Sequence, residues 1–229
     1  MAERPELALQ LAGCEAVLDA AGALWLPGAR TLVVSDLHLE KASSLARRGM
    51  LLPPYDTGAT LRRLESAVRA RDPRSVICLG DSFHDRAGPE RLAGEARARI
   101  AALQRGRDWV WVTGNHDPEL PPAIGGETAA TLVLGALTFR HEPCGGIRGE
   151  VAGHLHPAAK VARHGRSVRR RAFVSDGERL VLPAFGVLAG GLNVLDRAFA
   201  QVFRADAFLA FMLGERRLYP VAPHALAGD

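Results

Sequence analysis

Residues 31–41 read TLVVSDLHLEK, an apolar run followed at once by an aspartate and a histidine. Two later stretches have the same design: residues 76–84 read VICLGDSFH, and residues 109–117 read WVWVTGNHD. Each apolar run has the length of a buried strand. In an open α/β sheet, the residues just beyond the carboxyl ends of the strands line the binding crevice. We therefore expect these polar clusters to converge on one site.

Helical spacing fills the intervals between these strands. Segments 60–70 and 89–103 each place apolar residues on one helical face, so strands and helices alternate in the first half. From about residue 131, short apolar runs at 131–134, 137–139 and 150–152 are separated by turn residues, which predicts a mostly antiparallel sheet. No repeat or linker divides the chain. We expect one domain over residues 1–229, with an α/β fold of two packed sheets and helices outside.

The composition fits a globular protein, because 48% of the 229 residues are hydrophobic. No apolar run approaches the roughly 18 to 20 residues of a membrane span. The three cysteines are too widely spaced for a disulfide framework or a thiolate zinc site. We therefore expect a cytoplasmic protein without membrane association. The net charge of +4 comes almost entirely from arginine, which genome base composition also explains, so the charge identifies no partner.

Side chains that bind divalent metals gather at the predicted strand ends. Carboxylates, imidazoles and a carboxamide, without thiolates, suit Mn²⁺, Mg²⁺, Fe or Zn²⁺. The candidate ligands are Asp36, His38, Asp81, Asn115, His141, His154 and His156. They are too many for one ion, but two ions that share a bridging carboxylate use them all. Two such ions, about 3.5 to 4 Å apart, activate a bridging water and bind the oxygens of a phosphate ester.

Glycine precedes a candidate ligand at Gly80, Gly114 and Gly153. A residue without a Cβ lets the chain turn sharply and brings backbone close to the ions. Each short motif also occurs by chance, and a lone histidine after a strand is more often a hydrogen-bonded structural residue. The ordered set D-x-H, G-D, G-N-H-D, a later histidine and G-H-x-H favours a two-metal site over these separate explanations.

This order of motifs resembles the calcineurin-like metallophosphoesterase superfamily between Asp36 and His156. The resemblance implies a four-layer β-sandwich of two mixed sheets flanked by helices. It also implies that Asp36, His38 and His156 hold one ion, that Asn115, His141 and His154 hold the other, and that Asp81 bridges both. His141 is favoured as the lone histidine because it follows the predicted strand 137–139, whereas His164 and His224 fall outside the expected order.

A closer resemblance is to the ligase-associated DNA damage response endonucleases, the PdeM group of bacterial metallophosphoesterases, from the N-terminus to near residue 195. The similar stretches are residues 35–39 followed by Lys41, 80–84, 141–143, 153–157, and 182–186 with Gly190 and Gly191. The stretch LPAFG at 182–186 contains no ligand, so it indicates membership independently of the metals. Two departures are Glu40, where the group usually has glycine, and the more basic segment 169–174.

The PdeM-like resemblance implies a manganese-dependent endonuclease that cleaves DNA and works with a DNA ligase or helicase in repair. The superfamily resemblance assigns His116 to catalysis rather than to metal binding. Two divalent ions, two aspartates and a bridging hydroxide leave a net charge of about +1 to meet a phosphate anion. His116 is followed by Asp117, and an imidazole beside a carboxylate is held in one tautomer and favours its protonated form. We predict that His116, assisted by Asp117, protonates the leaving-group oxygen as general acid.

Other polar residues are candidates for substrate binding. His84, three residues past Asp81, contacts the substrate phosphate or makes a structural hydrogen bond, and both interpretations stay open. A basic run follows the G-H-x-H motif at residues 163–171. From this run we take Arg166, Arg169 and Arg170 as candidate contacts to a nucleic-acid backbone. A solvated arginine-rich hairpin explains the run equally well.

Two other functions are compatible with parts of the sequence. A phosphatase, or a hydrolase of nucleotide or lipid-linked pyrophosphates, would keep the metals and change the substrate, because the ligand charges do not distinguish monoesters from diesters. A non-enzymatic scaffold of the same fold would have lost ligands. Since no ligand of the pattern is missing, the scaffold is disfavoured.

Overall fold

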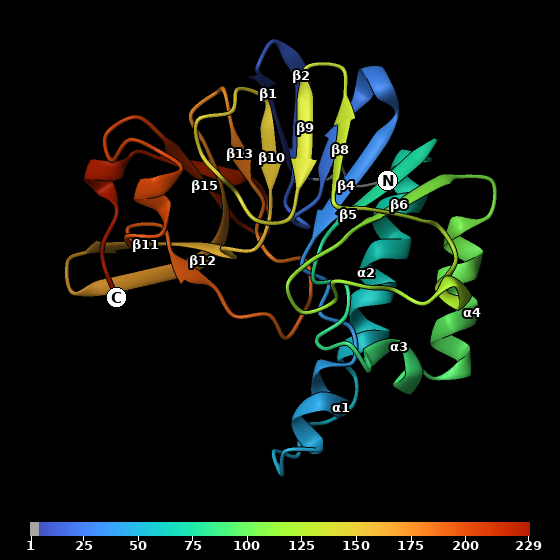
Figure 1. Cartoon of the computed structure of the whole chain (residues 1–229). Coiled ribbons are helices and arrows are strands. Elements are labelled where there is room, and N and C mark those ends of the chain that lie inside the picture. The colour runs from blue at the N-terminus through green and yellow to red at the C-terminus, as the bar shows by residue number, and fades with distance from the viewer. Residues whose placement is uncertain (1–4) are drawn as a thin grey trace.

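The computed structural model describes residues 5–229, whose strands form two sheets that pack against each other (Figure 1). The first sheet has seven strands in sequence order. They are β1 (Glu6–Leu11), β2 (Cys14–Asp19), β3 (Leu24–Leu26), β4 (Thr31–Ser35), β5 (Ser75–Leu79), β6 (Asp108–Val112) and β7 (Glu127–Ala129). Strands β1 to β4 pair antiparallel, whereas β4 to β7 run parallel. The three strands expected in the first half, β4, β5 and β6, therefore belong to its parallel part.

Helices accompany the first sheet. They are α1 (Lys41–Ala46), α2 (Asp56–Arg71), α3 (Gly88–Arg91) and α4 (Gly94–Gln104). Helices α2 and α4 cover its outer face, and α1 extends beyond the ends of its strands (Figure 1). Both expected helices form, but the segment 89–103 divides into α3 and α4 because Leu92 leaves the helical conformation, with φ −59° and ψ 120°. The sequence did not predict α1, because a helix of six residues is too short for apolar periodicity to appear.

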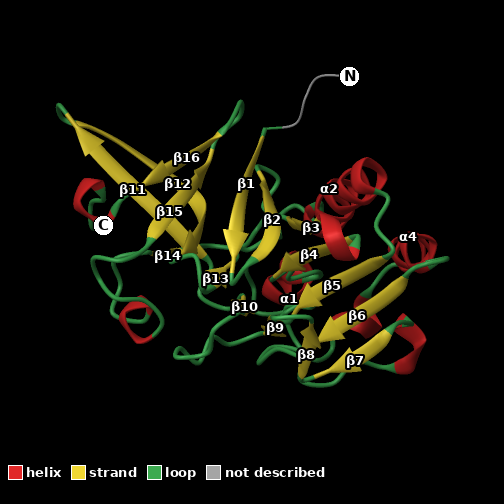
Figure 2. Cartoon of the chain, turned by 90° about the horizontal axis from the view of Figure 1, so that it is seen from above, coloured by secondary structure: helices red, strands yellow, loops and turns green. Residues whose placement is uncertain are grey.

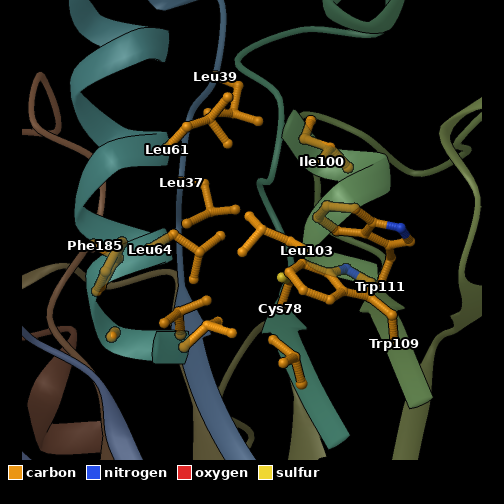
Figure 3. Packing of buried hydrophobic residues seen from close by; sticks show 14 of the residues in the cluster. Leu37, Leu39, Leu61, Leu64, Cys78, Ile100, Leu103, Trp109, Trp111 and Phe185 are labelled. Carbon is orange, nitrogen blue, oxygen red and sulfur yellow. The ribbon is translucent and has the colours of Figure 1, made fainter. Parts of the chain in front are cut away.

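The core under these helices also holds the first polar loop in place (Figure 3). Leu61 and Leu64 of α2 pack there together with Trp111 of β6. Leu37 and Leu39, which alternate with Asp36 and His38, are both 1% exposed and join the same cluster. Burying one leucine contributes roughly 1.5 to 3 kcal/mol. The leucines of the D-L-H-L stretch thus anchor the loop, while its aspartate and histidine face the other way.

The second sheet contains nine strands. They are β8 (Thr131–Leu134), β9 (Leu137–Arg140), β10 (Glu150–Ala152), β11 (Pro157–Arg163), β12 (Arg166–Ser175), β13 (Leu180–Val181), β14 (Leu192–Asn193), β15 (Leu209–Leu213) and β16 (Leu218–Val221). Their order is β14-β11-β12-β13-β10-β9-β8, with β15 paired to β12 and β16 paired to β15. Antiparallel pairs predominate, as predicted, but β10 runs parallel to both β9 and β13. The sheet is therefore mixed.

The predicted fold class of two mixed sheets with flanking helices is confirmed, with one difference in the outer layers. Val33, Ile77, Phe139 and Phe173 belong to the core between the sheets. The outer face of the second sheet is covered by residues from the segment between β14 and β15. They are Val194, Phe199, Val202, Phe203 and Phe208. Only a short 3-10 helix, Phe199–Gln201, forms in this segment (Figure 2). The fourth layer is thus mostly irregular chain.

The register of the strands places their polar ends together. Ser35, Leu79 and Val112, the last residues of β4, β5 and β6, lie side by side. In the second sheet, the last residues of β9 and β10, Arg140 and Ala152, are paired in the same way. The residues that follow all five strands therefore meet at one edge of the sandwich. Among residues 5–229, the structure shows no helix that is both long and apolar enough to span a bilayer.

Candidate metal centre

Backbone hydrogen bonds hold the loops at this edge together. The amide of His38 donates to the carbonyl of Asp81 over 2.9 Å, and the amide of Leu39 donates to Ser82 over 2.9 Å. From the second sheet, the amide of Gly153 donates to the carbonyl of His141 over 3.0 Å. The loops after β4 and β5 thus continue the sheet pairing beyond the strand ends, and the loops after β9 and β10 do the same.

Four side chains form a first group of possible metal ligands. One ligand atom each from Asp36, His38, Asp81 and His156 lies within 4.8 Å of the others. The Nε2 of His156 is 3.1 Å from Oδ1 of Asp36 and 3.2 Å from Nε2 of His38. The two imidazoles and the carboxylate therefore aim their coordinating atoms at one point.

A second group shares Asp81 with the first. Ligand atoms of Asp81, His141 and His154 again lie within 4.8 Å of one another. The Nε2 of His141 is 3.4 Å from Oδ1 of Asp81, 3.2 Å from Nδ1 of His154 and 2.9 Å from Oδ1 of Asn115. The structure therefore brings all seven predicted ligands together, with Asp81 common to both groups.

The charges at this centre fit two divalent cations. Asp36 and Asp81 are 0% and 2% exposed, and a buried carboxylate is costly without a compensating charge. In the described part of the chain, their ion-pair partners are histidines, with no lysine or arginine among them. Carboxylate, imidazole and amide oxygen donors without a thiolate suit hard or borderline divalent ions. The residues present therefore fit the metals that the sequence predicted.

Backbone strain is concentrated in the same residues. Five of the candidate ligands, Asp36, His38, Asp81, His154 and His156, have φ between 44° and 65°. Left-handed backbone is uncommon for residues other than glycine and costs of order 1 to 3 kcal/mol at each position. Such residues cluster at functional sites, where surrounding contacts enforce them. The strain supports the assignment of this edge as the functional centre.

Close contacts explain the glycines that precede the ligands. A Cβ on Gly114 would collide with the backbone nitrogen and carboxylate of Asp81, and one on Gly153 would collide with the hydroxyl of Ser35. Neither glycine has positive φ, so these two are required by space rather than by backbone conformation. Gly80 does have a φ of 68°, which fits the sharp turn predicted there.

The LPAFG stretch supports the first metal loop from behind. The amide of Phe185 donates to the carbonyl of Ser35 over 2.7 Å, and the amide of Gly186 donates to Asp36 over 3.1 Å. The stretch itself is held by two guanidinium groups, since Arg63 donates to the carbonyl of Phe185 over 2.9 Å and Arg171 to that of Ala184 over 2.8 Å. Sequence reasoning singled out this stretch only through resemblance, because it carries no ligand.

Comparisons with known proteins agree with this arrangement of metal ligands. The family profile for calcineurin-like phosphoesterase matches residues 29–199. The chain belongs to the calcineurin-like phosphoesterase family. The crystal structure of the Pseudomonas putida nuclease MPE is similar to it, with 26% identity and a TM-score of 0.71, over 94% of this chain and 100% of that one. YfcE, a phosphoesterase from E. coli, has 18% identity and a TM-score of 0.42, over 84% of this chain and 98% of that one. A sequence search of curated proteins returned no match.

The family and the arrangement of the site identify the chain as a metal-dependent phosphoesterase. The predicted superfamily is confirmed, and the likeness to nuclease MPE is consistent with the PdeM-like group.

In the phosphoesterase, His116 is oriented by a different group from the one predicted. Its Nδ1 is 2.8 Å from the carbonyl of His84, and its backbone amide donates to Oδ1 of Asp81 over 2.9 Å. Asp117 accepts hydrogen bonds from the amides of Gly114 and Phe83 and is fully buried. The prediction that Asp117 orients His116 is therefore corrected: Asp117 organises the backbone turn, and the His84 carbonyl fixes the imidazole tautomer.

His84 lies between the ligands and His116. Its ring stacks on that of His116, with centroids 5.2 Å apart and an interplanar angle of 21°, and its Nδ1 is 3.4 Å from Nδ1 of His38. Its own amide donates to the carbonyl of Leu39 over 3.0 Å. These contacts favour the structural interpretation of His84, which positions His116 through both its carbonyl and its ring.

The predicted substrate arginines lie on the hairpin of β11 and β12, and they do not share a face. Arg169 pairs with Lys160, whereas Arg166 pairs with Arg163 nearer the tip, and side chains alternate between the two faces along β12. Arg166 and Arg169 are an odd number of positions apart, so they point to opposite sides. Arg169 donates to the carbonyl of Gly191 over 2.6 Å and forms an ion pair with Asp229 at 3.2 Å.

The three arginines also differ in their distance from the metals. β11 begins at Pro157, directly after His156, and extends away from the sandwich (Figure 2). At about 3.3 Å per residue, Arg166 at the tip lies roughly 20 Å along the strand from His156. Arg170 faces a groove of about 580 Å³ with Val168 and Tyr219. Arg169 instead contacts Gly191, in the chain that follows LPAFG, so the predicted set does not form one surface.

Burial and charge set the protonation of the metal-free ligands. Burial lowers the pKa of His38 to about 3, so its nitrogens are free to coordinate. Burial would also lower the pKa of His141, but the hydrogen bond to Asp81 and the charges of Asp36 and Asp81 raise it to about 9. Metal binding must therefore displace a proton from His141. Burial raises the pKa of Asp117 to about 7 despite the backbone amides that it accepts.

Proposed function

We propose that this phosphoesterase is a manganese-dependent phosphodiesterase that cleaves DNA as an endonuclease. The observation that carries the proposal is the placement of His116, whose side chain is 39% exposed beside the buried Asp81. An exposed imidazole next to a two-metal centre can reach the oxygen of a departing sugar, which is a poor leaving group. The similarity to the P. putida nuclease MPE over nearly the whole chain supports the same substrate class.

The metals, when bound, supply a nucleophilic water and positive charge at the phosphate oxygens. The protein supplies the proton at the opposite end of the reaction. Because Nδ1 of His116 is bonded to the carbonyl of His84, Nδ1 carries its hydrogen and Nε2 is the atom that gains and loses the catalytic proton. Nε2 is 3.9 Å from Oδ2 of Asp81, so it faces the metal side of the loop. As the bond from phosphorus to the leaving oxygen breaks, Nε2 donates its proton to that oxygen.

Manganese is proposed on the PdeM-like resemblance, and the carboxylate and carboxamide oxygens of the donor set suit this ion. We also propose a cytoplasmic location, which fits three cysteines that are all free. A repair assembly with a DNA ligase or helicase is proposed on the PdeM-like resemblance.

The experiment that tests the function is cleavage of closed-circular plasmid by purified protein with EDTA, Mg²⁺, Mn²⁺ or Zn²⁺. We expect nicking with Mn²⁺, none with EDTA, and loss of nicking in Asp81→Ala and His116→Ala. Nitrophenyl mono- and diesters are assayed beside the plasmid. If the esters are hydrolysed while DNA stays intact with every metal, the centre is a phosphatase or pyrophosphate hydrolase and the proposal is wrong.

A further inference from the structure

The chain between the first metal loop and α2 lies beside His84. We call residues 41–55 the α1 arm; it contains α1 and the loop that follows, and Figure 1 shows it extending beyond the ends of β4 and β5. Leu39, two residues before the arm, forms a bridge with Phe83, and its carbonyl accepts the amide of His84 over 3.0 Å. The arm therefore starts at the side of the centre where His84 and His116 stack.

The base of the arm is fixed by hydrogen bonds. The carboxylate of Glu40 accepts the hydroxyl of Ser43 over 2.6 Å and that of Thr57 over 2.9 Å. Arg91 of α3 donates to the hydroxyl of Ser43 over 3.0 Å, and the amide of Ala42 donates to Asp56 over 2.9 Å. These contacts from two neighbouring helices make the base a defined support.

Beyond this base the arm is exposed. Residues 47–55 are all exposed, and they include Met50 at 56%, Leu51 at 85% and Tyr55 at 73%. Large apolar side chains gathered in one exposed segment mark a binding surface more often than scattered ones do. The arm thus offers apolar and aromatic surface beyond the strand ends that carry the metal centre.

The charge of the arm indicates what it binds. Within residues 5–229, neither Arg47 nor Arg48 forms an ion pair, whereas Arg91 and Arg99 of the adjacent helices form them at 2.9 and 2.7 Å. Both arginines follow α1 directly, on the arm that starts two residues after Leu39, whose carbonyl accepts the amide of His84. Unpaired cations beside His84 favour a polyanion over an apolar protein partner.

We infer that the α1 arm binds the part of a nucleic-acid strand that departs with the leaving oxygen, with Arg47 and Arg48 on its phosphates and Tyr55 against a sugar or base. The inference rests on the proposed function, in which His116 protonates that oxygen. His116 and the arm lie on the same side because His84 contacts both. The β11 and β12 hairpin lies apart from α1 in both views, so the arm is a separate contact (Figures 1 and 2). Aromatic and arginine side chains together are typical of nucleic-acid surfaces.

The test compares variants of the manganese-loaded protein on a polynucleotide and on bis-nitrophenyl phosphate, which is too small to reach the arm. The variants are Arg47→Ala/Arg48→Ala, Tyr55→Ala and Tyr55→Phe. The control Arg69→Ala/Arg105→Ala removes the same charge at exposed positions near the ends of α2 and α4, at the opposite edge of the first sheet.

We expect the double arginine variant to lose at least tenfold in kcat/KM on DNA relative to the small diester, mainly through KM. Removing one arginine from a phosphate should also reduce the slope of log affinity against log salt by roughly 0.7 to 0.9. Tyr55→Phe should retain more DNA cleavage than Tyr55→Ala. Arm variants that match the control in KM and salt slope would overturn the inference, as would a change in their assembly state without an effect on DNA. If the unmodified protein hydrolyses the small diester but cleaves no polynucleotide, the proposed function fails first.

Discussion

Replacing Gly153 with alanine adds one methyl group where the second sheet meets the first metal loop. The new Cβ would lie 2.6 Å from Oδ2 of Asp36, whereas real Cβ contacts stay above about 3.0 Å, so the carboxylate must move by about 0.4 Å. The hydroxyl of Ser35, which bonds to the same carboxylate, lies even closer to the new atom. Since metal–ligand distances tolerate about 0.2 Å, this shift exceeds what coordination by Asp36 allows.

The expected cost is divided between folding and metal binding. Overpacking in a buried site costs about 1 to 3 kcal/mol of stability. Disturbing a group that orients a ligand typically weakens metal affinity or activity by about 10- to 100-fold. We therefore expect Gly153→Ala to weaken Mn²⁺ binding in calorimetry by about 10- to 100-fold and to lower kcat on bis-nitrophenyl phosphate, with a reduced melting temperature in EDTA.

The control is Gly94→Ala at the start of α4, where an added Cβ meets no atom within 4 Å. It should bind Mn²⁺ normally and be as stable as the unmodified protein or slightly more so. Adding Ser35→Ala to Gly153→Ala should recover part of the stability but not the metal affinity, because Asp36 is still displaced. Normal Mn²⁺ affinity and turnover in Gly153→Ala would refute the reasoning about this contact.

Three further predictions concern the proton donor, the pH and the support of the loop. His116→Ala should lower DNA cleavage by about 10²- to 10⁴-fold but affect a nitrophenyl ester much less, because that leaving group needs no proton; equal losses would contradict general-acid catalysis. Because the pKa of His141 is raised to about 9 in the metal-free protein, Mn²⁺ binding should release a proton, and the affinity should rise by up to about tenfold per pH unit between pH 7 and 9. Calorimetry in buffers of different ionisation enthalpy measures the released proton. An affinity that does not change with pH would refute the prediction. Arg63→Met should cost about 1 to 3 kcal/mol in urea unfolding with EDTA, because the carbonyl of Phe185 loses its donor; an unchanged unfolding midpoint would show that the bond contributes nothing.

Most of the framework was predictable because apolar runs and polar strand ends are local signals. The strands expected at 32–34, 76–79, 109–112, 131–134, 137–139 and 150–152 all form. Their aligned ends bring the predicted ligands together, since the carboxyl ends of parallel neighbours meet at one edge. The order of the short motifs at the strand ends therefore predicted which residues, far apart in sequence, meet at the site.

Other features depend on contacts that adjacency in sequence does not reveal. Asp117 follows His116, yet the turn directs its carboxylate toward backbone amides, and a carbonyl from the loop after β5 orients the imidazole instead. The basic run was expected as a substrate surface, but strand alternation distributes its arginines over two faces. Glu40 stands where the resembled group usually has glycine, and it has a φ of 63°. Hydrogen bonds from Ser43 and Thr57 to its carboxylate stabilise this left-handed conformation. No local sequence pattern predicts these bonds.

The left-handed ligands have a consequence for the lifetime of the protein. Five strained residues raise the free energy of the empty loops, and bound metal stabilises only the native state that presents those ligands. At a free metal concentration of about 100 times Kd, one site adds about 2.7 kcal/mol to the free energy of unfolding. Proteases that cleave transiently opened chains would therefore degrade the empty protein first, and the supply of metal would govern how much of the protein a cell retains.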